Sequence, residues 1–258
     1  MRTASPFDGR GIAVLIAVIR HASTEWNAQG RMQGRRDIPL SAAGLADARR
    51  WHLPADLDDA TWVASPLSRA VETASVLAGR APRVEPALVE MDWGTWEGAR
   101  LDELRARYGD AFVENEARGL DFRPPRGESP RDVVARVVSW LTCIEAHESP
   151  IVAVTHNGVL RALVAAATGW DMTGKPPVRL HPATLHRFSL VQSGVLALVE
   201  ANVPLIPALS ASHPAPRAPA LSKALPGAMR VRAGRWRCAR TAGASHGARD
   251  RGGPKRAG

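Results

Sequence analysis

The chain has 258 residues, of which 45% are hydrophobic and 23% are charged. These values are ordinary for a soluble globular protein and allow one large or two small domains. The net charge of +9 is unevenly distributed, because residues 1–207 hold 23 Lys and Arg against 24 Asp and Glu, whereas residues 208–258 hold 11 against 1. The positive charge therefore belongs to the tail, and the nearly neutral main part does not have the charge of a nucleic-acid-binding domain.

Cysteine content and hydropathy bound the class of protein further. Cys143 and Cys238 lie far apart and indicate neither a disulfide framework nor a metal cluster. No apolar run in the sequence approaches the ~20 residues that cross a bilayer. Residues 11–19 look like a short signal peptide, but no small-residue cleavage site follows them. We therefore expect a cytoplasmic protein.

The first half of the chain predicts strands that alternate with helices. After a loose extension at residues 1–11, the apolar run at 12–19 predicts a central strand covered on both faces. A helix capped by Ser41 is expected to reach about Leu53, and a short strand at 61–67 precedes a helix closed by Gly79. Residues 82–130 are irregular, with one short helix at 101–108, and a long connection of this kind is more often a functional lid than filler.

Regular patterns return from residue 130. An amphipathic helix is expected at 130–147, capped by Glu128, before a buried strand at 151–155 and a helix that ends at Gly169. Strands at 184–191 and 195–201 predict a hairpin around Ser193 and Gly194. This order predicts an α/β domain at 12–207, a three-layer αβα sandwich with a mostly parallel central sheet. The Ala-, Pro- and Arg-rich residues 208–258 are expected to be disordered.

Basic and imidazole side chains follow three of the expected strands. Arg20 and His21 end the first strand, His156 and Asn157 follow the strand at 151–155, and Arg69 lies on the first turn of the helix after the strand at 61–67. In open α/β sheets, ligands bind beyond the carboxyl ends of the strands. Cations gathered there repel one another unless an anion lies between them. Phosphate is the natural candidate, because arginine forks and helix N-termini both bind its oxygens.

Four ordered blocks resemble the signatures of the histidine phosphatase superfamily, also called the phosphoglycerate mutase-like family. They are VIRHASTEWNAQGRMQGRRDIPLSAAG, ASPLSRAVETA, LVEMDWGTWEG and VTHNGVLRAL. The resemblance covers roughly residues 12–204 and implies the phosphoglycerate mutase-like fold. Ala22 departs from the family's usual glycine after the first histidine, from which we expect a modest reshaping of the pocket.

The resemblance implies a role for each matched residue. His21 would accept the phosphoryl group on its imidazole, and Arg20, Arg69 and His156 would surround that group and stabilise its oxygens. Glu90 would protonate the leaving oxygen and then act as base on the hydrolytic water. The implied phosphate pocket further includes Ala22, Ser23, Thr24, Asn27, Gln33, Gly34 and Asn157. No metal and no cofactor is implied, because fixed cations supply the charge.

Glu90 has two competitors in the same region, Glu85 and Glu97. The family's acid precedes a Gly-x-Trp-Glu-Gly element by a few residues, which selects Glu90. Two nearby tryptophans, Trp93 and Trp96, are interpreted as packing residues of the lid rather than substrate binders.

The sequence favours a hydrolase over a mutase within this family. Cofactor-dependent phosphoglycerate mutases carry a longer insert before the second histidine and a basic, Tyr-containing element after the acid. Here the corresponding stretch is MDWGTWEGA, with no basic cluster, and Gln33 and Gly34 stand where mutases tend to place Thr-Gly. We therefore expect a phosphomonoesterase, either broad in specificity or akin to α-ribazole phosphatase, acting on a small phosphorylated substrate.

Two other hypotheses remain. One is the cofactor-dependent mutase, and the other is a catalytically inactive phosphate-binding module. Inactive relatives typically lose the nucleophile or the acid, whereas this chain keeps both, so we rank the module lowest. The basic tail admits a weak possibility of a nucleic-acid or acidic partner, against the alternative of an extension with no selected role.

Overall fold

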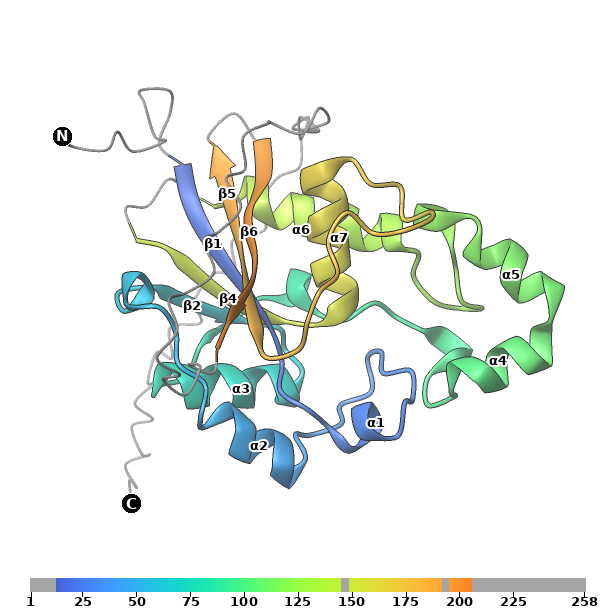
Figure 1. Ribbon diagram of the computed structural model, residues 1–258, viewed down its shortest axis with the longest axis horizontal. Helices are drawn as coiled ribbons and strands as arrows, with labels where there is room; N and C mark the ends of the chain where they lie inside the picture. Colours follow the sequence, from blue (N-terminus) through green and yellow to red (C-terminus); the bar gives the residue numbers. More distant parts are fainter. Residues whose placement is uncertain (1–12, 145–148, 192–194, 206–258) are drawn as a thin grey trace, which may run out of the picture.

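The computed structural model describes residues 13–144, 149–191 and 195–205, which surround one six-stranded sheet with the order β3–β2–β4–β1–β5–β6 (Figure 1). The strands are β1 (Ala13–Arg20), β2 (Thr61–Ala64), β3 (Arg83–Val84), β4 (Ile151–Thr155), β5 (Thr184–Val191) and β6 (Val195–Pro204). The pairs from β3 to β1 are parallel, and β5 and β6 add an antiparallel side. The prediction of a mostly parallel sheet is confirmed.

Helices cover both faces of this sheet. They are α1 (Glu25–Ala28), α2 (Ala42–Ala48), α3 (Ser68–Ala78), α4 (Leu101–Tyr108), α5 (Asp110–Glu116), α6 (Pro130–Thr142) and α7 (Asn157–Thr168). Ile16 and Val18 of β1 pack in one hydrophobic layer with α6 and α7, while Ala17 and Ile19 pack in the other with α2 and α3. All four side chains are fully buried, which explains why this strand is apolar from Ala13 to Ile19. The predicted three-layer sandwich is therefore confirmed.

Most helix ends follow the local signals in the sequence. The Ser41 hydroxyl accepts the Gly44 N–H at the start of α2, and Gly79 and Gly169 adopt left-handed conformations where α3 and α7 end. The prediction that Glu128 caps α6 is wrong. Ser129 is the cap, because its hydroxyl accepts the N–H of Asp132.

Two helices are shorter than predicted. α2 ends at Ala48 rather than near Leu53, because the Trp51 N–H closes a tight turn onto Ala48 O and the proline after Leu53 disfavours helical backbone there. α6 ends at Thr142, where the following N–H groups bond three residues back instead of four. Residues 145–147 of the predicted helix, the hairpin turn at 192–194, the extension at 1–11 and the tail at 208–258 lie outside the described residues.

The segment at 82–130 contains more structure than its composition indicates. The predicted helix at 101–108 is confirmed as α4, but α5 was not expected, and short 3₁₀ turns occur at Pro86–Leu88, Gly94–Trp96 and Gly119–Asp121. Trp96, Leu104 and Phe112 form a small hydrophobic cluster of their own. The segment therefore packs as a satellite unit beside the sheet, where Figure 1 shows α4 and α5 apart from the main layers.

The strand order explains how the predicted site residues come together. β4 lies between β2 and β1, with Ala64 opposite Val154 and Arg20 opposite Thr155. Residues that follow these three parallel strands are consequently neighbours at one edge of the sheet.

Candidate active site

His21 is held at this edge by its backbone and by one ring nitrogen. Its N–H donates to Thr155 O at 2.9 Å, and its Nδ1 lies 2.7 Å from Ala22 O. A carbonyl oxygen only accepts hydrogen bonds, so Nδ1 carries the proton in the neutral ring. The second nitrogen, Nε2, then carries no proton and has a free lone pair.

The surroundings of His21 keep its ring neutral. Burial is the main cause that lowers its pKa from 6.5 to about 3, and the positive charges of Arg20 and Arg69 act in the same direction. The bond to Ala22 O opposes this shift. At neutral pH the imidazole is therefore uncharged, which is the form required of a nucleophile.

Ala22, the departure from the family pattern, is accommodated in the core. It is 2% exposed and packs in the layer with α2 and α3, and its N–H donates to Thr73 Oγ1 at 3.0 Å. Thr73 in turn donates to Arg69 O, which links the backbone beside His21 to α3.

His156 packs against the ring of His21, and Arg69 donates a hydrogen bond to His156. The rings of His21 and His156 have centroids 5.0 Å apart. Arg69 Nε donates to His156 Nδ1 at 3.3 Å, so His156 Nε2 carries the proton and donates to Ser65 Oγ at 2.7 Å. The remaining Arg69 nitrogens donate to Gly34 O and Arg36 O at 2.8 and 3.0 Å. The structure thus brings the predicted cations together but engages both nitrogens of His156 with protein.

Glu90 follows the turn at Pro86–Leu88 and is buried beside the start of α7. Its two oxygens accept N–H groups of Met91 at 2.8 Å and of Gly158 at 3.2 Å. Burial raises the pKa of Glu90, and this effect outweighs the two hydrogen bonds and the charges of Arg69 and Arg20, which lower it. Burial therefore favours the protonated form of Glu90 more than water favours it for an exposed glutamate.

The other two acidic candidates have structural partners. The Glu85 carboxylate accepts the Ala87 N–H at the start of a 3₁₀ turn. Glu97 accepts the N–H groups of Arg35 and Arg36 and so fixes the loop whose carbonyls hold Arg69. Of the three carboxylates, Glu90 is the one that lines the cavity beside His21.

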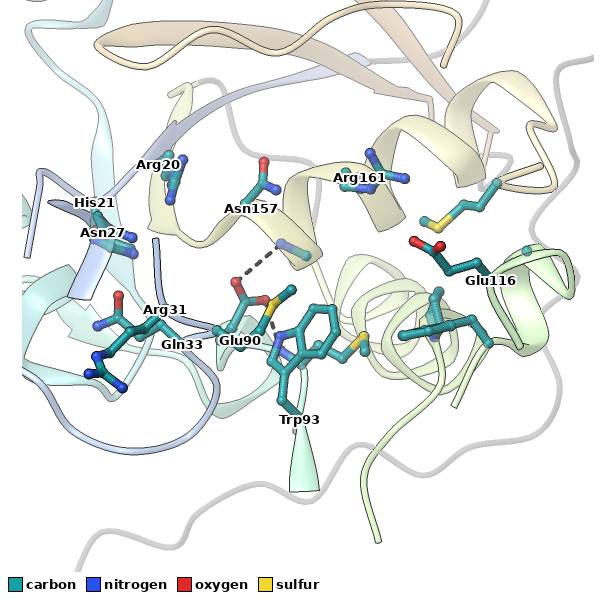
Figure 2. A pocket seen from close by; sticks show the side chains of 17 residues that line it. Arg20, His21, Asn27, Arg31, Gln33, Glu90, Trp93, Glu116, Asn157 and Arg161 are labelled. Carbon is teal, nitrogen blue, oxygen red and sulfur yellow. Dashed lines mark hydrogen bonds between the residues drawn. The ribbon is translucent and has the colours of Figure 1, made fainter. Parts of the chain in front are cut away.

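A cavity of about 420 Å³ opens beside these residues (Figure 2). Its walls include six of the predicted site residues, namely Arg20, His21, Asn27, Gln33, Glu90 and Asn157. In Figure 2 Arg20 and His21 lie at one end, Arg161 and Glu116 at the other, and Glu90 between them. The cavity thus has a cationic end with a neutral imidazole, and a second end formed by α5 and α7.

The remaining predicted residues lie around this cavity rather than on its wall. Ala22 and Ser23 line an adjoining hollow of about 310 Å³ that shares Arg20, His21 and Asn27 with it. Thr24 is fully buried, caps α1, and donates to Gln33 Oε1 at 2.9 Å. Gly34 lies against Glu97, where a Cβ would come within 2.0 Å of Oε1. These residues shape the loop that carries Asn27 and Gln33.

Sequence reasoning missed the other residues that line the cavity. They are Arg31, Met32, Met91, Trp93, Glu116, Gly119, Phe122, Pro130, Gly158, Arg161 and Met172. Arg161 was detectable, because it lies four residues after Asn157 and so on the same helix face. Most of the others come from the aperiodic segment at 82–130. Trp96 packs in the satellite cluster as predicted, whereas Trp93 packs on Phe122 and also lines the cavity.

The described residues contain neither a metal-binding cluster nor a membrane-spanning helix. No cluster of three or more His, Cys, Asp or Glu side chains in that part of the chain is arranged to hold a metal ion. No helix there has the length and apolar character to cross a membrane.

Comparison with known proteins agrees with this geometry. The model of the histidine phosphatase superfamily (branch 1) matches residues 16–203. A 2,3-bisphosphoglycerate-dependent phosphoglycerate mutase from Methylobacterium radiotolerans is 35% identical over 181 residues, covering 64% of this chain and 84% of the relative. Among solved structures, mycobacterial hydrolase 2 is similar with a TM-score of 0.65 and 26% identity, over 78% of this chain and 94% of that one.

A second solved structure bears a more specific name. Mycobacterial glucosyl-3-phosphoglycerate phosphatase is similar with a TM-score of 0.56 and 27% identity, over 68% of this chain and 90% of that one. The sequence blocks, the sheet and the family match agree with one another. The chain belongs to the histidine phosphatase superfamily (branch 1).

Proposed function

We propose that this chain is a metal-independent phosphomonoesterase that works through a phosphohistidine intermediate. One observation carries the proposal: a neutral His21, with Nδ1 bound to a carbonyl and Nε2 left as a lone pair, shares a cavity with a buried carboxyl of raised pKa, Glu90. A nucleophile and a proton donor on one cavity wall are the two groups that phosphoryl transfer to histidine requires.

In the first half-reaction, His21 Nε2 attacks the phosphorus atom and the ester P–O bond breaks. Glu90 gives its proton to the departing alkoxide oxygen, so the alcohol leaves neutral and the phosphoryl group remains on His21. Arg20, on the cavity wall, stabilises the oxygens of the transferred group. Arg69 adds positive potential, and the neutral ring of His156, which accepts a hydrogen bond from Arg69, packs against the imidazole of His21.

In the second half-reaction, water replaces the alcohol. The Glu90 carboxylate takes a proton from the water as its oxygen attacks phosphorus, and the P–N bond to His21 breaks. Inorganic phosphate leaves, His21 returns to the neutral ring, and Glu90 is protonated again. Glu90 donates a proton in the first half-reaction and accepts one in the second, while His21 gains and then loses the phosphoryl group. The reaction is therefore balanced without a further cofactor.

The mutase remains the second candidate, because the curated relatives with 31–35% identity carry that name. Both functions share the first half-reaction and differ in whether water or a second phosphoglycerate oxygen takes the phosphoryl group. The absence of a basic element after Glu90 in the sequence supports the hydrolase. Isomerisation of 3-phosphoglycerate stimulated by 2,3-bisphosphoglycerate, in excess over phosphate release, would decide for the mutase.

The proposal is tested with p-nitrophenyl phosphate and three proteins: wild type, His21→Ala and the matched control His52→Ala. His52 is exposed and does not line the cavity. We expect turnover by wild type and the control, loss of turnover in His21→Ala, and an acid-labile phosphate on His21 after rapid quenching. Equal turnover by His21→Ala would refute the mechanism, and phosphate binding without turnover by wild type would support the inactive module.

A further inference from the structure

Arg161 brings a second cation into the cavity, away from the nucleophile. It lies on α7, four residues after Asn157, and both residues line the cavity (Figure 2). Four residues of helix correspond to about 6 Å along the axis. Asn157 follows His156, which contacts the ring of His21. Arg161 therefore lies roughly one helical turn from the end where the phosphoryl group reacts.

The charge of Arg161 is not matched by an acid. No carboxylate of the described residues lies within 4.0 Å of its guanidinium, which instead lies over the Trp170 ring, 4.8 Å from the centroid. The ring holds one face of the group and leaves the N–H edge for a planar acceptor. Partial burial lowers the pKa of Arg161, since desolvation disfavours the charge. A nearby anion would relieve that cost.

Two of the other charged groups on the cavity wall, Glu116 and Arg31, already have partners. Glu116, the acid at the same end, is held by Arg105 through contacts of 3.0 and 3.1 Å to its two oxygens. Arg31 donates to Gly98 O at 2.7 Å and to Gln29 Oε1 at 2.8 Å. Arg20 lies at the reacting end. Among the described residues, Arg20 and Arg161 are thus the cavity cations whose side chains make no hydrogen bond or ion pair, and Arg161 is the one that lies away from the reacting end.

We propose that Arg161 binds a carboxylate of the substrate, so that the enzyme acts on phosphomonoesters that carry an acid group near the ester. The proposal deepens the proposed function and rests on it. A single guanidinium matches the charge and the planar, two-oxygen shape of a carboxylate, whereas a second phosphate dianion would call for more than one cation. This places acid recognition on α7, and not after Glu90, where the sequence lacks a basic element.

The test compares two substrates that differ in one group. 3-Phosphoglycerate has a carboxylate where glycerol 3-phosphate has a hydroxymethyl group, so the ratio of their kcat/KM values measures recognition of the acid. We expect wild type to favour 3-phosphoglycerate, and Arg161→Gln to lower this ratio about 10- to 100-fold, as for loss of a hydrogen-bonded charge pair. Arg161→Lys keeps the positive charge but lacks the planar guanidinium. Its ratio is expected to lie between those of wild type and Arg161→Gln.

Two variants serve as controls. Arg179→Gln removes the same charge from a residue that shares a small neighbouring hollow with Arg161 but does not line the cavity, and it should leave the ratio unchanged. Arg31→Gln tests another cation on the cavity wall, one that is not placed at the reacting phosphorus. A ratio that is unaltered in Arg161→Gln, or that falls only in Arg31→Gln, would overturn the proposal.

Failure of this inference is distinguishable from failure of the proposed function. If wild type hydrolyses neither substrate nor p-nitrophenyl phosphate, the hydrolase itself is wrong. If wild type hydrolyses all three and Arg161→Gln keeps the same ratio, only the role of Arg161 is wrong. Glycerol 3-phosphate turnover by each variant also reports whether the protein has folded.

Discussion

Replacing Gly158 by alanine is expected to disable Glu90 without removing it. Gly158 lies in the first turn of α7, where an added Cβ would come within 2.4 Å of Glu90 Oε1 and 3.3 Å of both Glu90 Cδ and Met91 Cβ. An alanine in a helix is by itself favourable relative to glycine, so the backbone does not oppose the change. The Glu90 carboxyl group must therefore move away from the added Cβ.

The size of the effect follows from these contacts. Real Cβ atoms essentially never approach a neighbour within 3.0 Å, so the carboxyl oxygen must retreat from 2.4 Å to at least that distance. Glu90 is 6% exposed and is held by the N–H groups of Met91 and Gly158, so it cannot rotate without breaking those bonds. Misplacing a catalytic group by about 1 Å costs roughly 100-fold, and we expect a loss of about 10- to 100-fold here.

Two substrates with different leaving groups separate proton donation by Glu90 from the other steps of the reaction. An alkoxide leaving group needs the proton of Glu90, whereas p-nitrophenolate leaves without it. The kcat/KM of Gly158→Ala should therefore fall for glycerol 3-phosphate and change little for p-nitrophenyl phosphate, since kcat/KM reports the first half-reaction. The kcat of Gly158→Ala should be lower than that of wild type for both substrates, because Glu90 also activates the water in the second half-reaction.

A double variant provides the decisive control. If Gly158→Ala acts through the acid, it adds almost nothing to Glu90→Gln, and the two losses are strongly non-additive. Additive losses, or an equal fall in kcat/KM for both substrates, would refute the reasoning. Thermal unfolding of each variant checks that the fold is retained.

Three further changes test other parts of the site. Thr73→Val leaves the Ala22 N–H without its acceptor and should lower the free energy of unfolding by about 1–3 kcal/mol, as measured by urea titration. Unaltered stability would contradict this prediction. Glu97→Gln should loosen the loop that holds Arg69 and raise KM for p-nitrophenyl phosphate by more than it lowers kcat; an effect on kcat alone would argue against this. The folded pKa of His21, about 3, lies below its ordinary 6.5, so the unfolded chain takes up the proton first as the pH falls and stability is lost below about pH 6.5. Between about pH 7 and pH 5 this amounts to about 2 kcal/mol, and His21→Ala should flatten that slope; equal slopes would contradict the buried neutral ring.

The sequence was most informative where one local rule dominates. Continuous apolar runs predicted β1 and β4, because a strand buried on both faces has no polar side. Glycines at 79 and 169 predicted two helix ends, since each adopts a left-handed conformation there. The placement of His21 and His156 after their strands followed from the same patterns.

Local rules failed where non-local packing decides. α5 and the satellite cluster around Trp96 and Phe112 have no strong periodicity in the sequence, because these aromatic residues pack against one another across several short elements. The early end of α2 depends on the turn at Trp51 as well as on Pro54. Glu128 was interpreted as a cap, yet it binds Arg35 and Arg136 from distant parts of the chain.

The sequence by itself determined the order of the main strands and helices of the sandwich, the family signature, and the residue types that follow β1, β2 and β4. Only the tertiary structure decided which of these residues share a cavity and that both nitrogens of His156 are engaged. It also decided that Arg161 lines the same cavity as Glu90 with no ion pair to any described residue. The physical reason is that residue type and spacing specify local conformation. Burial, pKa and charge pairing depend instead on groups that are distant in the chain and meet only when the sheet has formed.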